Sequence, residues 1–148
     1  MNTMKKLNTP LRPTELRIDP TVIEKKRNAI YVGDFCISQS GQWINRPCQI
    51  YYQEQAPVLG YSNYFAVFVN EEGQAMITSG KSIEGLEFDA IEHNGQILYS
   101  AYRYDYRADK SGSVAIDGGR DYTRIIGTPQ RSMRLKIVGP DIFEIDGR

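Results

Sequence analysis

The sequence predicts an α+β fold, made mainly of antiparallel β-sheet with one or two short helices in a single domain. The chain has 148 residues, of which 41% are hydrophobic, and this suits one domain with a real core. Short segments rich in β-branched and aromatic residues alternate with turn residues along most of its length. Two of these segments flank Asn94-Gly95, the strongest short-range hairpin signal.

The chain begins with a basic segment, residues 1–28, that differs from the rest. Residues 1–18 are polar, contain two prolines and lack periodicity, so we expect a tail or an arm. Asp19 and Pro20 then give an N-cap followed by a proline at the first helical position, which predicts a short helix over Thr21–Asn28. This segment is a candidate oligomerisation anchor.

Residues 29–148 form the predicted β-rich domain, in which almost every segment is typical of a strand or a turn. Turns at Glu71-Glu72-Gly73, Asn94-Gly95 and Gly139-Pro140-Asp141 each join two strands into a hairpin. The expected strands are Ile30–Ile37, Pro47–Gln53, Tyr64–Val69, Gln74–Thr78, Phe88–Ile91, Gln96–Ala101, Ser113–Asp117, Met133–Val138 and Ile142–Ile145.

Charge and cysteine usage exclude several classes of protein. The formal net charge is zero, which argues against a general DNA-binding protein. Cys36, Cys48 and His93 are the only cysteines and histidine, too few for a structural zinc site, which needs about four ligands. Neither a membrane-spanning apolar run nor the hydrophobic stretch of a secretory signal is present. We therefore expect a cytoplasmic protein with reduced thiols, no metal and no membrane partner.

The segment Tyr99–Ile126 is the best candidate for a binding surface, because it interleaves tyrosines with arginines and aspartates around Gly118-Gly119. Residues 100–136 carry a net charge of +4. If residues 96–107 are extended, their side chains alternate between two faces. One face would carry Leu98, Ser100, Tyr102, Tyr104 and Tyr106, and the other Tyr99, Ala101, Arg103, Asp105 and Arg107.

These residue types suit a nucleotide-like anion. A guanidinium matches phosphate, a carboxylate accepts from ribose hydroxyls, and a tyrosine ring stacks on a base. An ordinary solvated hairpin decorated with arginine–aspartate pairs explains the same pattern, so both interpretations stay open.

Other sequence motifs are weaker evidence for a function. Ser79-Gly80-Lys81-Ser82 looks like the end of a P-loop, but Ala75 stands where that motif requires glycine. His93 falls in a predicted turn, where a solvated side chain is the ordinary state. Asp117 with Asp121, or Asp105 with Asp109, are carboxylate pairs suited to metal or acid–base work, but arginines between them favour ion pairs.

Two runs carry a family resemblance. They read Tyr99-Ser100-x-Tyr102-Arg103-x-Asp105-Tyr106 and Gly112-Ser113-Val114-x-Ile116-Asp117-Gly118-Gly119-Arg120-Asp121-Tyr122-x-Arg124. The pattern resembles small bacteriophage accessory proteins, in particular the Thoeris anti-defence sponge family, over about residues 30–127. Members of that family bind and sequester glyco-cyclic ADP-ribose, the signal of bacterial TIR-domain enzymes, without degrading it. Some also bind cyclic oligonucleotides at a separate site.

The resemblance implies a non-enzymatic phage protein of the host bacterial cytoplasm, without a cofactor, that forms dimers able to associate further. In the implied site, arginines donate to the pyrophosphate, Asp121 accepts from a ribose, and aromatic rings form a flat wall against adenine. The ligand-binding residues are then Arg120, Asp121, Arg124, Arg103, Arg107, Tyr104, Tyr122 and Phe88, with no catalytic residue and no metal ligand.

Two other functions remain open from the residues. A phage inhibitor that binds a host enzyme would use the same tyrosines and arginines, which are enriched at protein interfaces. A small nucleotide-modifying enzyme would depend on Asp117 or Asp121. The sequence leaves undetermined the signal isomer, the oligomer size, a second ligand site, and the roles of residues 1–18 and of the extension after Gly127.

Overall fold

The fold is mainly antiparallel β-sheet with one short α-helix, as the sequence predicts. The computed structural model describes residues 4–6, 18–35, 37–39, 42–43, 48–100, 105–119 and 122–145. The helices are α1 (Pro20–Arg27) and the 3₁₀ turn η1 (Lys81–Ile83). The strands are β1 (Met4–Lys6), β2 (Ile30–Phe35), β3 (Ser38–Gln39), β4 (Gln42–Trp43), β5 (Cys48–Tyr52), β6 (Tyr64–Val69), β7 (Ala75–Ser79), β8 (Glu87–His93), β9 (Gln96–Leu98), β10 (Arg107–Ala108), β11 (Ala115–Asp117), β12 (Arg124–Ile126), β13 (Arg131–Val138) and β14 (Asp141–Ile145).

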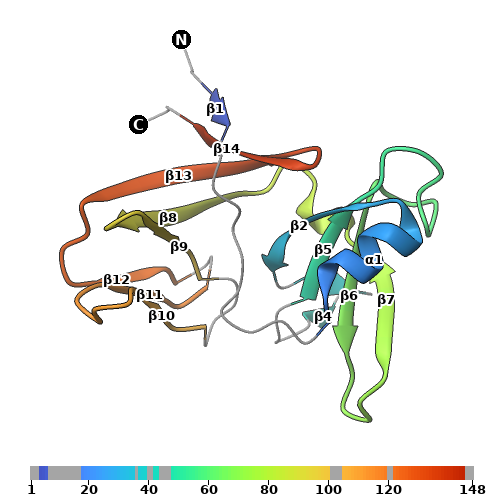
Figure 1. The fold of residues 1–148 in the computed structure, drawn as a ribbon, viewed down its shortest axis with the longest axis horizontal. Helices are drawn as coiled ribbons and strands as arrows, with labels where there is room; N and C mark the ends of the chain where they lie inside the picture. The colour runs from blue at the N-terminus through green and yellow to red at the C-terminus, as the bar shows by residue number, and fades with distance from the viewer. Residues whose placement is uncertain are drawn as a thin grey trace.

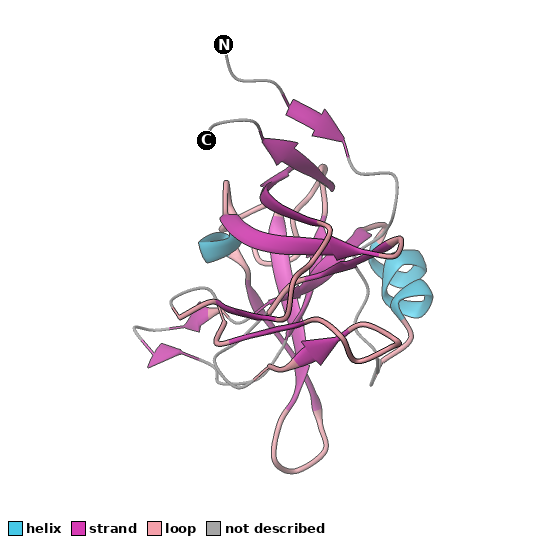
Figure 2. Ribbon diagram, turned by 90° about the vertical axis from the view of Figure 1, so that its left-hand side faces the viewer, coloured by secondary structure: helices cyan, strands magenta, loops and turns pink. Residues whose placement is uncertain are grey.

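The strands form two main sheets and two smaller ones. A four-stranded sheet has the order β2-β5-β6-β7, and a five-stranded sheet has the order β1-β14-β13-β8-β9. Strands β10, β11 and β12 form a third sheet, and β3 pairs with β4. Figure 1 shows the four-stranded sheet with α1 on the right and the five-stranded sheet on the left, with β10–β12 below it. Strands β1 and β14, the first and last that the structure describes, pair with each other, and Figure 2 shows them side by side from a second direction.

The helix α1 follows the predicted capping pattern. The side chain of Asp19 accepts a hydrogen bond from the backbone N–H of Thr21 at 3.1 Å, and Pro20 occupies the first helical position. Basic residues fill the last turn, where their positive charges interact favourably with the negative end of the helix dipole. Asn28 ends the helix in the left-handed conformation, with φ of 51°.

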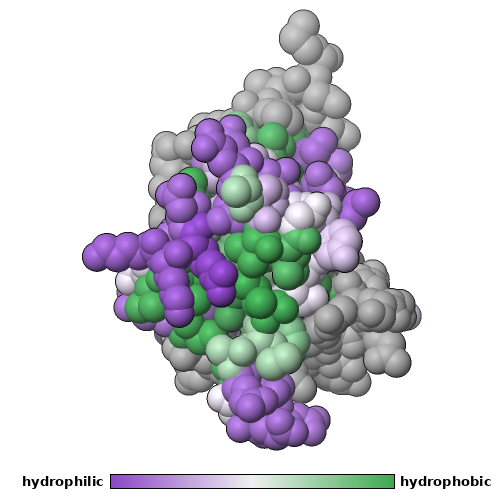
Figure 3. Space-filling view, turned by 90° about the vertical axis from the view of Figure 1, so that its right-hand side faces the viewer, coloured by the Kyte–Doolittle hydropathy of each residue, from purple (hydrophilic) through white to green (hydrophobic). Residues whose placement is uncertain are grey.

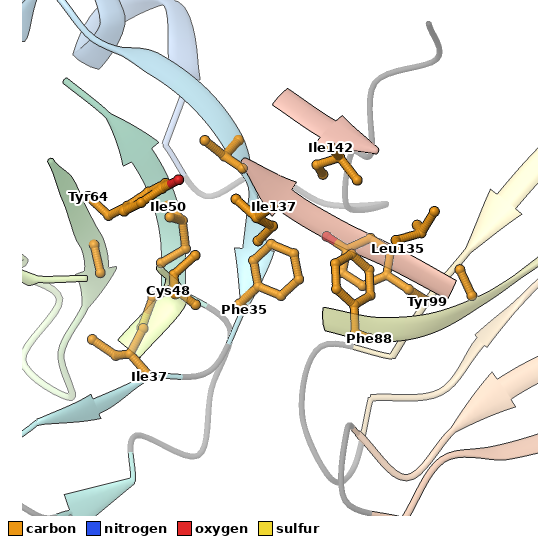
Figure 4. Close-up of a cluster of buried hydrophobic side chains, with 14 of the residues drawn as sticks. Phe35, Ile37, Cys48, Ile50, Tyr64, Phe88, Tyr99, Leu135, Ile137 and Ile142 are labelled. Atoms are coloured by element: carbon orange, nitrogen blue, oxygen red, sulfur yellow. The ribbon is translucent and has the colours of Figure 1, made fainter. Parts of the chain in front are cut away.

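The main core lies between the two large sheets (Figure 4). Phe35 of β2 packs edge-on against Phe88 of β8, with ring centroids 5.1 Å apart, and Tyr99 lies 5.3 Å from Phe35. These aromatic contacts join the two sheets into one hydrophobic unit. The other buried members are Val32, Ile37, Cys48, Ile50, Tyr64, Ala66, Ile83, Ala90, Met133, Leu135, Ile137 and Ile142.

Smaller clusters cover the outer faces of both sheets. Tyr51 and Phe65 stack with centroids 5.2 Å apart on the face of the four-stranded sheet that carries α1. On the other side of the molecule, Ile91 and Leu98 pack against Val114 and Ile116 of the β11 segment. The three-stranded sheet is therefore attached to the five-stranded sheet through a cluster of its own.

The hairpin signals are confirmed where the structure describes them. Asn94 and Gly95 both have positive φ, 50° and 80°, and form a two-residue turn between His93 and Gln96. In the β6–β7 turn, the side chain of Asn70 accepts hydrogen bonds from the backbone N–H groups of residues 72 and 74.

The structure differs from the expectations in several places; for example, β10 and β12, which pair with β11, are not among the expected strands. The expected strand Gln96–Ala101 ends as β9 at Leu98, and Leu98, Tyr99 and Ser100 are all buried, so side chains do not simply alternate between two surface faces here. The cause is that Tyr99 enters the core between the main sheets. Within the arm, residues 4–6 pair with β14 of the same chain, which adds an edge strand. Within the part of the chain that the structure describes, no helix is long and apolar enough to cross a membrane.

Candidate functional site

Three of the eight sequence-predicted ligand residues, Arg120, Asp121 and Tyr122, fall in the sequence between β11 and β12, and Arg124 is the first residue of β12. The turn between these strands begins with Gly118 and Gly119, which have φ of 89° and 69°. A Cβ atom on Gly118 would lie 1.9 Å from the carbonyl oxygen of Tyr122. Only glycine fits there, because both the backbone conformation and the space exclude a side chain.

Side-chain hydrogen bonds fix the base of this turn. The backbone N–H of Gly119 donates to Ser100 Oγ at 2.8 Å, and that hydroxyl donates to the carbonyl oxygen of Asp105 at 2.7 Å. Thr123 Oγ1 donates to the carbonyl oxygen of Gly119 at 2.6 Å. The turn is therefore anchored to the buried segment that follows β9.

Two predicted ligand residues at this turn are exposed. Tyr122 is 65% exposed, and the Arg124 side chain is 69% exposed. Arg124 already forms a bidentate ion pair with Asp117, its cross-strand partner, at 3.0 and 2.9 Å. The ion pair lowers the pKa of the Asp117 carboxyl and raises that of the guanidinium. An anion at this guanidinium would have to share it with Asp117.

Arg107 has a structural role, because its guanidinium contacts Tyr99 and Asp105 of the same chain. Its side chain is buried, and its guanidinium carbon lies 4.4 Å from the centroid of the Tyr99 ring. Its Nε donates to Asp105 at 2.9 Å. The cation therefore stabilises the interior behind the turn through a cation–π contact and an ion pair.

Phe88 is likewise a core residue. It is 3% exposed, and its ring contacts Phe35 and Tyr99. The structure thus separates two predicted ligand residues, Phe88 and Arg107, from the exposed pair Tyr122 and Arg124. The other four lie outside the described residues: Arg103, Tyr104, Arg120 and Asp121.

A buried polar network adjoins Arg107, and the sequence-based reasoning did not identify it. Asp34 of β2 is 4% exposed and accepts a hydrogen bond from the Tyr31 hydroxyl. The Tyr99 hydroxyl donates to the backbone carbonyl of Asp34 at 3.1 Å, and the backbone N–H of Asp34 lies 3.2 Å from the same hydroxyl. Burial raises the pKa of Asp34 to about 6, although the Tyr31 hydrogen bond and the charge of Arg107 oppose the shift. The sequence feature that could have identified this network is the single charged residue, Asp34, within strand β2.

The described residues give little support to a serine–histidine–aspartate site. Ser113 Oγ lies 3.4 Å from His93 Nε2, but the Asp109 carboxylate bonds to the Ser111 hydroxyl and to the backbone N–H of Val114. Those hydrogen bonds lower the pKa of Asp109 to about 2. Within the described part of the chain, His93 Nδ1 has no hydrogen-bond partner, so no carboxylate orients the ring.

Within the described residues, neither a cluster of metal ligands nor the pocket beside α1 adds a second site. The described residues contain no cluster of three or more histidine, cysteine or acidic side chains that could hold a metal ion. One surface pocket of about 340 Å³ lies beside the end of α1, and none of the predicted ligand residues lines it. Its lining is Asn28, Ala29, Ile30, Tyr52, Glu54, Gln55 and Pro140.

We compared the chain with protein-family models, curated proteins and solved structures, and none of the three comparisons found a match.

Proposed function

We propose that this protein binds a small nucleotide-derived anion, of the glyco-cyclic ADP-ribose class, and sequesters it without cleaving it. The observation that carries the proposal is the anchored turn between β11 and β12. In this turn only glycine fits at position 118, and the Tyr122 side chain is exposed. The resemblance of residues 30–127 to the phage sponge family supports the same ligand class. In this proposal the protein acts in the host bacterial cytoplasm, as a homo-oligomer, against an immune signal.

In this proposal four residues at the turn contact the ligand. Arg120 and Arg124 donate charge-assisted hydrogen bonds to the pyrophosphate, and Asp121 accepts from a ribose hydroxyl. Tyr122 stacks on the adenine, which adds about 1–3 kcal/mol for a base on an aromatic ring. Because hydrogen bonds of Gly119 and Thr123 hold the base of the turn before binding, that base loses little conformational entropy when the ligand arrives. A sponge also needs slow release, and nanomolar affinity corresponds to about −12 kcal/mol.

The test is recovery of intact ligand. Purified protein is incubated with glyco-cyclic ADP-ribose isomers and cyclic oligonucleotides, the free pool is measured, and the sample is heated to release what was bound. We expect unchanged ligand to leave the free pool and to return after heating. A converted product would instead indicate an enzyme. Ligand that stays free throughout would favour the inhibitor of a host protein.

Tyr122 provides the sharpest variant. We expect Tyr122→Ala to lower the affinity by about tenfold or more and Tyr122→Phe to retain most of it, because stacking needs the ring rather than the hydroxyl. Tyr61→Ala is the matched control, since Tyr61 is also exposed, at 77%, but lies between β5 and β6. Equal binding by the Tyr122→Ala and Tyr61→Ala variants would contradict this site. Isothermal titration with the ligand that the release assay identifies measures all three.

A further inference from the structure

The outer edge of β7 carries backbone groups that pair with no other strand of the described residues. Strand β7 is the last of its sheet and pairs with β6 on one side, and among the strands that the structure describes none pairs with its other side. Gly80 N–H donates to the Tyr64 carbonyl, and Asn70 N–H donates to the Gln74 carbonyl. In an antiparallel pair, the backbone N–H and C=O groups of alternate residues point toward the partner strand. The backbone groups of Met76 and Thr78 therefore point toward β6. The N–H and C=O groups of Ala75, Ile77 and Ser79 therefore point outward.

This edge lacks the features that usually protect a strand from pairing. The strand reads Ala-Met-Ile-Thr-Ser, without lysine, proline or any charged residue. Met76 is 41% exposed, and Ile77 is half-buried. Figure 3 shows apolar surface over this edge of the sheet, between the polar tip of the β6–β7 hairpin and α1. Both the backbone and the side chains of the edge therefore favour a partner strand.

We propose that β7 pairs with β7 of a second copy of this chain, antiparallel, about a two-fold axis at Ile77. The two four-stranded sheets then become one continuous sheet across the axis. Ile77 lies opposite Ile77 of the second copy, and Ala75 lies opposite Ser79. Each of these pairs exchanges both of its backbone hydrogen bonds. Met76 then lies beside Thr78 of the second copy on the other face of the sheet.

Charge selects a second copy, in this orientation, as the occupant. Glu71 and Glu72 are exposed in the turn just before β7. After β7 the first charged residue is Lys81, which is exposed, and Glu84, also exposed, follows beyond η1 and therefore farther from the end of the strand. Antiparallel pairing brings Lys81 of each copy toward the acidic turn of the other, and the two-fold axis makes this contact twice. Parallel pairing would bring like charges together. An unrelated extended peptide would supply the backbone bonds but has no reason to carry the matching charges.

Proline at Ile77 tests the backbone pairing. Ile77→Pro removes an outward N–H and leaves the hydrogen bonds to β6 in place, which is the edge position where a sheet tolerates proline. We expect the wild-type protein and the matched control Ile77→Val to dimerise in sedimentation velocity, and Ile77→Pro to stay monomeric with an unchanged circular dichroism spectrum. Amide exchange by NMR should slow at residues 75, 77 and 79 as the wild-type concentration rises.

Charge reversal tests the orientation without touching the strand. Lys81→Glu, and separately Glu71→Lys with Glu72→Lys, should each raise the dimer dissociation constant about tenfold or more. A mixture of the two variants should restore association, because both contacts are then opposite in sign. Three results would overturn the proposal: wild-type protein that is monomeric up to about 1 mM, a dimer that persists in Ile77→Pro, or a mixture that does not associate. None of these assays involves the ligand, so they test the β7 interface separately from the ligand binding that the release assay measures.

Discussion

At the scale of single residues, Asp34 is the clearest case of a group whose environment changes its chemistry. The Asp34 carboxyl is buried, which favours its neutral form, and the Tyr31 hydroxyl and the Arg107 cation compensate only in part. Its pKa of about 6, against 3.8 for an ordinary aspartate, makes the free energy of unfolding depend on pH.

The sign of that dependence follows from proton binding. Between pH 4 and pH 6 the folded protein holds a proton on Asp34 that the unfolded chain has released. The contribution of Asp34 to stability therefore falls as pH rises through this window, by about 3 kcal/mol in total. We expect Asp34→Asn to remove this fall, as measured by urea unfolding at pH 4.5 and pH 7.

Asp109→Asn is the control for that prediction. The pKa of Asp109 is lowered to about 2, so the stability that its charge supplies is lost only as pH falls from about 4 toward 2. The Asp109→Asn variant should therefore keep the wild-type change between pH 4.5 and pH 7. An unaltered change in the Asp34→Asn variant would show that Asp34 titrates normally.

At the scale of elements, the turns divide into those set by local sequence and those set by tertiary contacts. Gly95 needs only its positive φ, and a Cβ there would meet no atom within 4 Å. Gly118 needs both its φ and the empty space beside the Tyr122 carbonyl. We expect Gly95→Ala to lower the free energy of unfolding by about 1–2 kcal/mol and Gly118→Ala by more than about 3 kcal/mol. Urea unfolding of both variants measures the difference, and equal losses would mean that the turn at Gly118 relaxes freely.

The same division explains how much of the fold and of the site could be predicted. Asp19-Pro20 and Asn94-Gly95 act through neighbouring backbone, so the sequence identifies α1 and the β8–β9 hairpin closely. The roles of Arg107 and Phe88 depend on Tyr99, from the segment after β9, and on Phe35 of β2. A pattern of tyrosines and arginines in the sequence does not show which of these residues are buried. The prediction therefore placed Arg107, which packs on Tyr99, in the same binding site as the exposed Arg124.

At the scale of the whole molecule, one core joins the two main sheets, while the three-stranded sheet has its own cluster. Leu135 of β13 belongs to the shared core, whereas Ile116 of β11 belongs to the smaller cluster. A cavity in the shared core should therefore weaken both sheets together, and a cavity in the smaller cluster should weaken the three-stranded sheet first.

Native-state hydrogen exchange tests this arrangement. Leu135→Ala should lower the free energy of unfolding by about 2–5 kcal/mol and reduce the protection of amides in β5 and β13 by equal amounts. Ile116→Ala should reduce protection in β11 by more than in β5, because its cavity opens only the attached sheet. If Leu135→Ala left β5 protected, the two large sheets would be separate folding units. The anchored turn would then rest on the five-stranded sheet alone, and the contact between Tyr99 and β2 would add little to its rigidity.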